Sequence, residues 1–226
     1  MKNKFNYVLL LVFFTPSLLY SQPESKHAVF FTTGKVYYMY EEPERNFSAG
    51  LTYQYRPFKA FSFDGFYSYS QKNSFPSFFE DKAKLHNYIM SLSARYFIAW
   101  SEIYTHSVGI RPHYSIINTN RWHLSLNFAF GVSFSRFSEQ SSKRLTWSLI
   151  TGQIIDYELH DHEKGSISGI FVSPGLQVHF NFYKDFIFGL NPHVHYFRPG
   201  ADSEVLNSVP VWPEFINLSI MIGKKF

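Results

Sequence analysis

The chain of 226 residues contains no cysteine, which excludes disulfide frameworks and thiolate metal sites. It is also poor in charge, because only 17% of its residues are Asp, Glu, Lys or Arg, against roughly 25% in an average soluble domain. Its cations form no run long enough to follow a phosphate backbone. The net charge of +4 therefore favours solvated loop charge, and we expect no nucleic-acid partner.

Long apolar segments are missing as well. Beyond the N-terminus, no stretch approaches the roughly 20 consecutive apolar residues that a membrane-spanning helix needs. The mean hydropathy is −0.17, yet aromatic residues make up 20% of the chain, with 26 Phe and 16 Tyr. So much aromatic surface with so little charge predicts that part of the exterior does not face water. A β-barrel reconciles these facts, because only alternate residues of each strand contact lipid.

The N-terminus has the pattern of a secretory signal peptide. Lys2 and Lys4 precede an apolar run from Tyr7 to Phe14, which is too short to span a bilayer. We therefore predict export through a cleaved signal peptide at residues 1–22, followed by a single domain at residues 23–226.

The main signal in the rest of the chain is an alternation of side-chain type with a period of two residues. Between Trp122 and Phe134 the even positions are large and apolar, while the odd positions are His, Ser, Asn, Ala and Gly. Small polar side chains suit a crowded, hydrogen-bonded lumen better than open water. The alternation recurs in segments at 29–40, 47–56, 61–70, 87–96, 104–114, 122–134, 145–156, 170–182, 186–196 and 216–223.

The predicted fold is all-β: a single antiparallel, up-and-down transmembrane β-barrel of about ten strands. Each segment has close to the 9–11 residues, roughly, that a membrane-crossing strand needs. With ten strands, both termini and the short turns, such as the link at 57–58, lie on the periplasmic side, and the longer link at 138–143 also lies there. The link at 118–120 then lies outside. An alternative of eight strands omits segment 29–40 and treats 139–166 as one loop.

The C-terminal segment ends in an aromatic residue, Phe226, directly after the last alternating strand. A terminal aromatic resembles the membrane-insertion signal of outer-membrane barrels. Lys224 departs from the usual apolar residue, but at the membrane edge its amine can reach water. Together with the signal peptide and the repeated alternation, this ending resembles the broad class of small outer-membrane β-barrel proteins of Gram-negative bacteria. The resemblance implies a location in the cell outer membrane. It also implies outer-membrane lipids, lipopolysaccharide and, during biogenesis, the barrel-assembly machinery as partners.

One short segment concentrates reactive side chains, and we expect it at the rim of the barrel. The cluster comprises Asp156, Glu158, His160, Asp161, His162 and Glu163. Residues of these types can ligate a divalent metal or activate water. A solvated loop, or a site for cations that bridge lipopolysaccharide phosphates, is the favoured interpretation. We assign no catalytic residue, no metal and no cofactor to it.

Nine further polar residues are expected to point into the lumen. They are Arg56, Asp64, Arg95, Arg111, His113, His123, His179, His193 and His195. Buried charges must be paired and buried polar groups hydrogen-bonded, so a structural network is the favoured interpretation. The interior of so small a barrel is mostly filled by side chains, so we do not expect the wide aqueous channel of a porin.

These patterns favour a non-enzymatic envelope protein with a structural or surface-interaction role. Two alternatives stay open. One is a narrow channel or small-ligand carrier that uses the Arg- and His-lined lumen. The other is a surface hydrolase, either a protease or a lipid A-modifying enzyme, that uses His and Asp residues at the rim.

Overall fold

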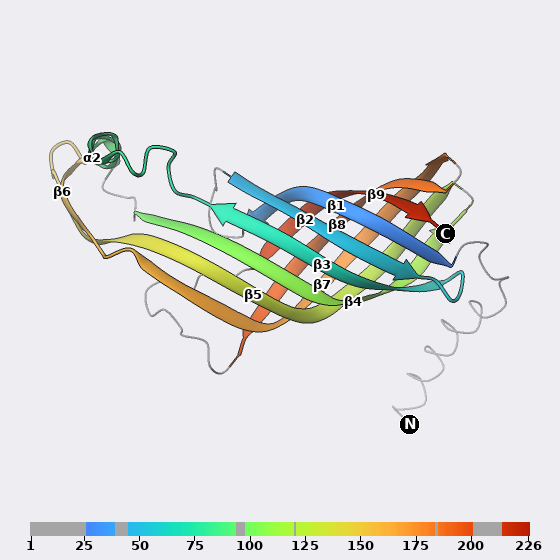
Figure 1. Cartoon of the computed structure of the whole chain (residues 1–226). Coiled ribbons are helices and arrows are strands. Elements are labelled where there is room, and N and C mark those ends of the chain that lie inside the picture. The colour runs from blue at the N-terminus through green and yellow to red at the C-terminus, as the bar shows by residue number, and fades with distance from the viewer. Residues whose placement is uncertain (1–25, 39–44, 94–97, 120, 184, 201–213) are drawn as a thin grey trace, which may run out of the picture.

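The computed structural model describes residues 26–38, 45–93, 98–119, 121–183, 185–200 and 214–226. Within these ranges the chain forms nine strands and one helix, α2 (Lys82–Ser91) (Figure 1). The strands are β1 (His27–Tyr38), β2 (Arg45–Tyr55), β3 (Phe61–Asn73), β4 (Ala99–Asn118), β5 (Trp122–Trp147), β6 (Ile154–Leu159), β7 (Glu163–Tyr183), β8 (Phe186–Pro199) and β9 (Phe215–Lys225).

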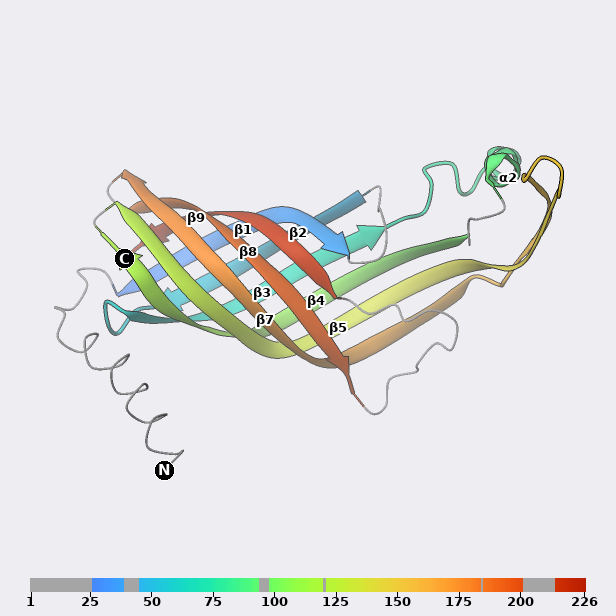
Figure 2. The same cartoon turned by 180° about the vertical axis from the view of Figure 1, so that it is seen from behind.

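Eight of the nine described strands close into a barrel. Neighbours pair antiparallel in the order β4-β3-β2-β1-β9-β8-β7-β5, and β5 pairs back onto β4. The first and last strands meet along their length, from the pair Ala28 and Lys225 to the pair Tyr38 and Phe215. Seen from behind, β8 and β9 continue the wall beside β1 (Figure 2). The closed ring leaves no unpaired edge between its strands.

The prediction of ten strands is wrong, and the alternative of eight gives the count of the closed barrel. Segment 87–96 lies partly in α2, and its residues 94–96 fall outside the described ranges. Segment 145–156 belongs to the end of β5 and to β6, which form a hairpin beyond the barrel. The alternative is also wrong in detail, because β1 is part of the barrel and most of 139–166 is strand.

Helix α2 shows why the alternation misled. The Asp81 carboxylate accepts a hydrogen bond from the Lys84 amide at 3.2 Å and caps the helix. Leu85 and Ile89, four residues apart, then share one face, and Ile89 is fully buried. In an apolar segment this short, periods of two and of 3.6 residues fit equally well. No helix among the described residues is long and apolar enough to cross a membrane.

The barrel wall is much taller on one side. Strands β4, β5 and β7 have 20, 26 and 21 residues, whereas β1, β2 and β9 have 12, 11 and 11. The long strands project past the others and carry β6 and α2 at their end (Figures 1 and 2). We call this projection the head, and it comprises residues 74–93, 98–101 and 139–163.

The head has a hydrophobic core of its own. Ile89, Ile98, Trp100 and Ile154 are buried together. Their partly buried neighbours are Phe75, Phe79, Leu85, Met90, Leu92, Leu145, Tyr157 and Leu159. The Ile154 amide donates to the Leu92 carbonyl at 3.4 Å, so the end of α2 is tied to the start of β6. The head is therefore a folded unit and not a loose loop.

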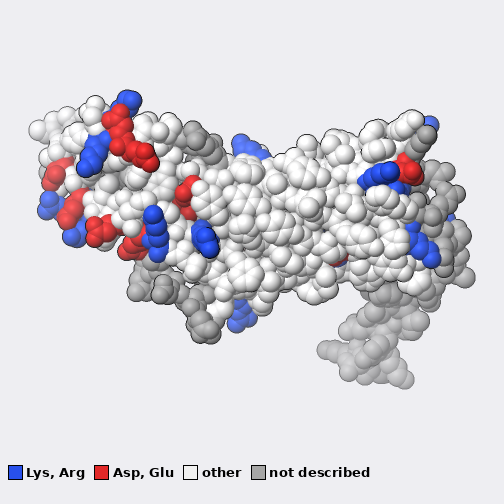
Figure 3. All heavy atoms as spheres, in the orientation of Figure 1, with Lys and Arg blue, Asp and Glu red and all other residues white. Residues whose placement is uncertain are grey.

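The outer face of the barrel is a continuous apolar belt. Figure 3 shows charged side chains gathered at the two ends of the molecule and almost none at its waist. Exposed apolar side chains alternate along the strands there, among them Leu51, Tyr67, Val108, Ile110, Leu126, Phe130, Val132, Ile170, Leu190, Leu218 and Ile220. Soluble monomers rarely expose contiguous apolar patches above a few hundred Å². The belt therefore faces membrane lipid.

The two ends of the barrel differ in their links. At the end where β1 begins and β9 ends, β2–β3, β4–β5 and β7–β8 are joined by five, three and two residues. The head lies at the other end. Short turns are usually periplasmic in bacterial barrels, so this difference in link length favours the head as the outward end. The sequence predictions for two links are wrong, because the link between β4 and β5 lies at the short-turn end and 138–143 is part of strand β5.

Candidate functional site

The structure places eight of the nine predicted lumen residues on the inward face, and Arg95 lies outside the described ranges. His193 is partly buried. The other seven have exposed fractions of 8% or less: Arg56, Asp64, Arg111, His113, His123, His179 and His195.

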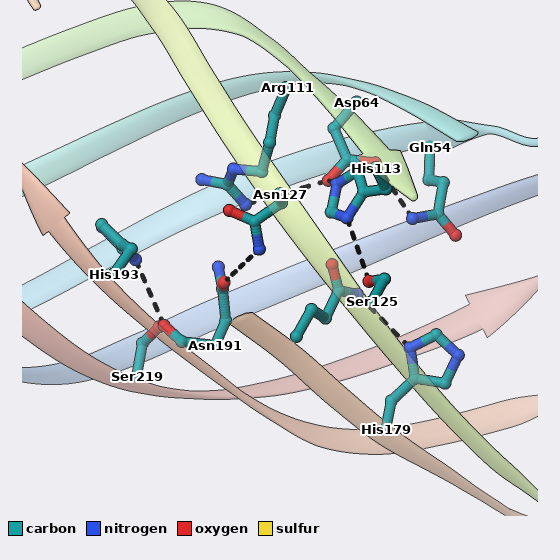
Figure 4. Close-up of polar contacts among 11 residues, drawn as sticks. Gln54, Asp64, Arg111, His113, Ser125, Asn127, His179, Asn191, His193 and Ser219 are labelled. Carbon is teal, nitrogen blue, oxygen red and sulfur yellow. Dashed lines mark hydrogen bonds and ion pairs between the residues drawn. The ribbon is translucent and has the colours of Figure 1, made fainter. Parts of the chain in front are cut away.

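Asp64 on β3 is the centre of one lumen network (Figure 4). Its carboxylate is 2.7 Å from His113 Nε2, accepts from Gln54 Nε2 at 3.0 Å, and lies 3.8 Å from Arg111 Nη1. The other nitrogen of His113 is 3.3 Å from the Ser125 hydroxyl. A carboxylate that is 1% exposed thus has donors and a cation around it, which offsets its loss of hydration.

A second lumen network surrounds His123 on β5. Arg56 Nη2 lies 3.1 Å from His123 Nε2, and the Ser115 hydroxyl lies 2.8 Å from the same nitrogen. The His123 ring stacks on His179 with centroids 4.3 Å apart and planes within 10°. Gln177 in turn contacts His179 at 3.3 Å. The arginine N–H can donate to His123 Nε2 only if that nitrogen carries no hydrogen.

Aromatic rings fill space between these polar groups. Phe66 and Phe171 pack with Ala129 in a buried cluster, and the Arg111 guanidinium lies 4.4 Å from the Phe66 ring centroid. His195 stacks on Phe171 on one side and on Phe215 on the other, with centroids 4.6 Å apart in both cases. Side chains from many strands thus interlock across the lumen, as in other barrels of this size.

The predicted rim cluster lies in the head, but the structure divides it. Asp156 pairs with Arg144 at 3.0 Å, and Glu158 pairs with Lys143 at 2.8 Å, across the β5–β6 hairpin. All four side chains are largely exposed. The hydrogen bond with Lys143 lowers the pKa of Glu158 and raises the pKa of Lys143. These two acids of the cluster are occupied in hairpin ion pairs.

The rest of the cluster faces two ways. His160, Asp161 and Glu163 line a cavity of about 40 Å³ together with Glu139. His162 points elsewhere, and its Nε2 forms a hydrogen bond with the Ser138 hydroxyl. Among the described residues, no group of three or more His, Cys, Asp or Glu side chains is placed to hold a metal ion. The sequence cluster is therefore not one site.

His162 and Ser138 line a cleft of about 690 Å³ between the loop before α2 and the wall of the barrel. Phe75 and Phe79 form its apolar side, with ring centroids 5.6 and 6.2 Å from that of His162. Glu102 lies opposite Ser138 in the β4–β5 register and also lines the cleft. The sequence pattern does not indicate this cleft, because only strand register and the fold of the head bring its residues together.

The apex of the β5–β6 hairpin is the most exposed apolar part of the head. Leu149 and Ile150 are each 96% exposed. The Ser148 hydroxyl accepts hydrogen bonds from the amides of Ile150 and Thr151, both at 3.2 Å. The backbone carbonyl of Ser148 accepts a hydrogen bond from the Gly152 amide at 2.8 Å. Gly152 has a φ of 68°, a left-handed conformation that glycine adopts without steric cost. The alternation of segment 145–156 predicts a lipid-facing strand at Leu149, and this prediction is wrong, because Leu149 lies in the turn.

Comparison with known proteins identifies the fold. No protein-family model matches the sequence, and no curated protein matches it. A major outer membrane protein from Thermus thermophilus superposes with a TM-score of 0.50 at 12% identity, covering 90% of this chain and 100% of that one. Neisserial surface protein A gives 0.49 at 11% identity, covering 92% and 100%. Ail, the attachment invasion locus protein of Yersinia pestis, gives 0.45 at 13% identity, covering 91% and 99%.

At such low identity a likeness of this kind concerns the fold alone. The first of these comparisons and the closed barrel agree that the chain has the fold of a small outer-membrane β-barrel protein. The resemblance that the sequence analysis stated is confirmed at that level. With the apolar belt, the protein is a membrane barrel that contacts lipid.

Proposed function

We propose that this protein is a non-enzymatic outer-membrane barrel that acts through its head as an interaction surface outside the cell. The observation that carries the proposal is the separate hydrophobic core of the head, around Ile89, Trp100 and Ile154. Simple loops between barrel strands need no such core. A hydrophobic core beyond the membrane gives the head a defined surface, which a partner outside the cell could bind.

The lumen supports the same choice. Asp64, Arg111 and His113 hold one another, and Phe66 and Phe171 pack between the polar groups. Every charged group in this network has partners within the barrel wall, and its role is to stabilise the wall. The proposal therefore places interactions in the head and gives the lumen a structural role.

Location and biogenesis are part of the proposal. Export would use the signal peptide predicted at residues 1–22, which lie outside the described ranges. Insertion by the barrel-assembly machinery would use the C-terminal strand and Phe226. The outer leaflet would supply lipopolysaccharide around the base of the head, where charged side chains of both signs gather (Figure 3).

Cysteine labelling tests the placement of the head. Because the chain has no cysteine, Leu149→Cys and Phe58→Cys each introduce a single reactive thiol, at opposite ends of the barrel. A membrane-impermeant maleimide applied to intact Gram-negative cells should label Leu149→Cys. Phe58→Cys should react only after the outer membrane is made permeable. Folding is checked by the gel shift between unboiled and boiled samples. Labelling in the opposite order would overturn the proposal.

Single-channel recording tests the role of the lumen. The refolded protein in a planar bilayer should give no discrete conductance steps, because Asp64, Arg111 and the stacked rings occupy the interior. Reproducible steps that change size in Arg111→Ala would instead support the narrow channel or small-ligand carrier.

A surface hydrolase is the second candidate, and one contact favours it. The Ser138 hydroxyl is hydrogen-bonded to His162 Nε2, and a serine and a histidine joined in this way can act as nucleophile and base in acyl transfer. Both residues line the cleft beside Phe75 and Phe79. A fluorophosphonate probe would label Ser138 if the pair is active. We expect no labelling above that of Ser138→Ala. Labelling that is lost in both Ser138→Ala and His162→Ala would replace the first proposal with this one.

A further inference from the structure

The hairpin apex is the centre of a segment without charge. Residues 145–155 contain one tryptophan, five aliphatic side chains and no Asp, Glu, Lys or Arg. Leu145 and Ile154 enter the head core. The others point outward, with exposed fractions of 47% for Trp147, 96% for Leu149 and Ile150, and 56% for Ile155. A water-soluble hairpin has no folding reason to place four such side chains in the medium.

The apex is also preorganised. Ser148 accepts three hydrogen bonds across the turn, two at its hydroxyl and one at its carbonyl. Below the turn, Trp147 pairs with Ile154, and the Ser148 amide donates to the Gln153 carbonyl at 2.8 Å. Because the backbone is held, inserting the side chains into a partner costs little additional ordering.

The charges nearest to the apex cancel. Lys143 is bonded to Glu158, and Arg144 is bonded to Asp156. The hairpin stem thus presents two cations and two anions, and its net charge is zero. Such a surface neither attracts an anionic partner nor is repelled by one, which fits a surface whose headgroups are neutral overall.

The apex lies far from the membrane that holds the barrel. The last outward apolar residue of the belt on β5 is Phe134, and β5 continues for 13 residues to Trp147. At roughly 3.3 Å per residue this is about 40 Å of strand. In Figure 1 the β6 hairpin and α2 form the end of the molecule farthest from the C-terminus. The apex therefore points away from its own bilayer.

We infer that Leu149 and Ile150 insert into a second lipid bilayer that faces the cell, with a zwitterionic surface. This inference rests on the proposed function, which places the head outside. Two aliphatic side chains on a convex turn can enter the acyl region, while Trp147 behind them suits the headgroup boundary. A convex apex encloses no small ligand. The neutral stem removes any need for anionic lipid.

Vesicle binding tests the inference. The full protein, refolded in phosphatidylcholine nanodiscs, is mixed with sucrose-loaded phosphatidylcholine vesicles and sedimented. The Leu149→Ser/Ile150→Ser variant should lower the vesicle partition coefficient about tenfold or more, because two apolar side chains lose their burial. Phe58→Ser, which removes an exposed ring at the opposite end, is the control and should bind as the unchanged protein. All samples must first show the gel shift of a folded barrel.

A second measurement identifies the occupant. The Leu149→Cys variant is labelled with an environment-sensitive fluorophore. When vesicles are added, the emission maximum should move to shorter wavelength, and spin-labelled lipid in the vesicles should quench the emission. Absence of vesicle binding, or undiminished binding by the double serine variant, would overturn the inference. A shift that arises without vesicles, from contact between two nanodisc copies, would assign the apex to self-association instead. If the same cysteine is labelled on intact cells but binds no vesicle, the inference fails while the proposed function stands.

Discussion

The lumen and the head each contain an arginine–aspartate pair, and the two pairs differ in an instructive way. In the head, Arg144 and Asp156 are 3.0 Å apart, with 64% and 59% of their side chains exposed. In the lumen, Arg111 and Asp64 are 3.8 Å apart, with 7% and 1% exposed. The closer pair remains hydrated when it separates, whereas either member of the lumen pair would be left as a buried charge. Burial, more than distance, decides how much the fold depends on a pair.

The two regions also differ in their cores. The lumen holds small apolar clusters such as Phe66 with Phe171, separated by polar networks. The head holds one contiguous apolar core around Trp100 and Ile154. Lipid covers the outer face of the barrel, so the barrel can be stable with a polar interior. The head projects beyond the apolar belt, so the apolar side chains around Trp100 and Ile154 are covered by one another and not by lipid.

The largest expected effect is in the lumen. Asp64→Asn keeps the shape of the side chain but leaves Arg111 without its counter-charge. The substitution should lower the free energy of unfolding of the barrel by about 3–5 kcal/mol. The measurement is urea unfolding in lipid vesicles, with the gel shift as the readout of the folded fraction. Asp156→Asn breaks the exposed pair in the head and should leave the unfolding midpoint unchanged. Equal effects of the two variants would contradict the contrast drawn between the pairs.

The next effect separates the head from the barrel. Ile154→Ala removes a side chain that is 1% exposed and should cost the head about 2–5 kcal/mol. We expect rapid proteolysis within 139–163 while the barrel keeps its gel shift. Ile155→Ala, at the neighbouring exposed position, is the control and should resist the protease like the unchanged protein. Loss of the gel shift in Ile154→Ala would mean that head and barrel fold as one unit.

A smaller effect is expected from the backbone of the apex. Gly152→Ala places a Cβ at a φ of 68° and should destabilise the turn by roughly 1–2 kcal/mol. Faster hydrogen exchange of the Gln153 and Ser148 amides would measure it. Gly65→Ala in the barrel wall adds a methyl group with no atom within 4 Å and should be neutral. Unchanged exchange in Gly152→Ala would show that the apex is not held by its turn.

The smallest effect concerns pH. Lys143 lowers the pKa of Glu158, so the contribution of this pair is present above the ordinary glutamate pKa and is lost as pH falls through the lowered value. Because both side chains are exposed, only a slight rise in hydrogen exchange across β6 is expected on acidification. Glu158→Gln should remove this pH dependence. A rise of the same size in that variant would assign the effect to other groups.

The sequence predicted most of the barrel wall and failed where tertiary contacts decide. The segment from Trp122 to Phe134 alternates so regularly that its outward face follows from the sequence. Residues 87–96 alternate too, but the Asp81 cap and the packing of Ile89 against Ile154 of β6 favour a helix that extends to Ser91. A cap of this kind is visible in a sequence, whereas the partner that covers Ile89 is not. Ser138 and His162 come together through the pairing of β5 with β7, where Glu139 lies opposite Glu163, and the sequence does not show this register.

The sequence by itself determined that the chain forms a closed barrel with an apolar exterior and a polar lumen. Side chains alternate across a strand with a strict period of two residues, so the pattern is local and needs no knowledge of neighbours. The tertiary structure alone decided the strand number, because a strand counts as part of the wall only if it pairs on both sides. It also decided that 145–155 lies beyond the barrel, with an exposed apex at its centre. The same apolar residues fit a lipid-facing strand or a projecting hairpin, and only the pairing of β5 with β6 distinguishes the two.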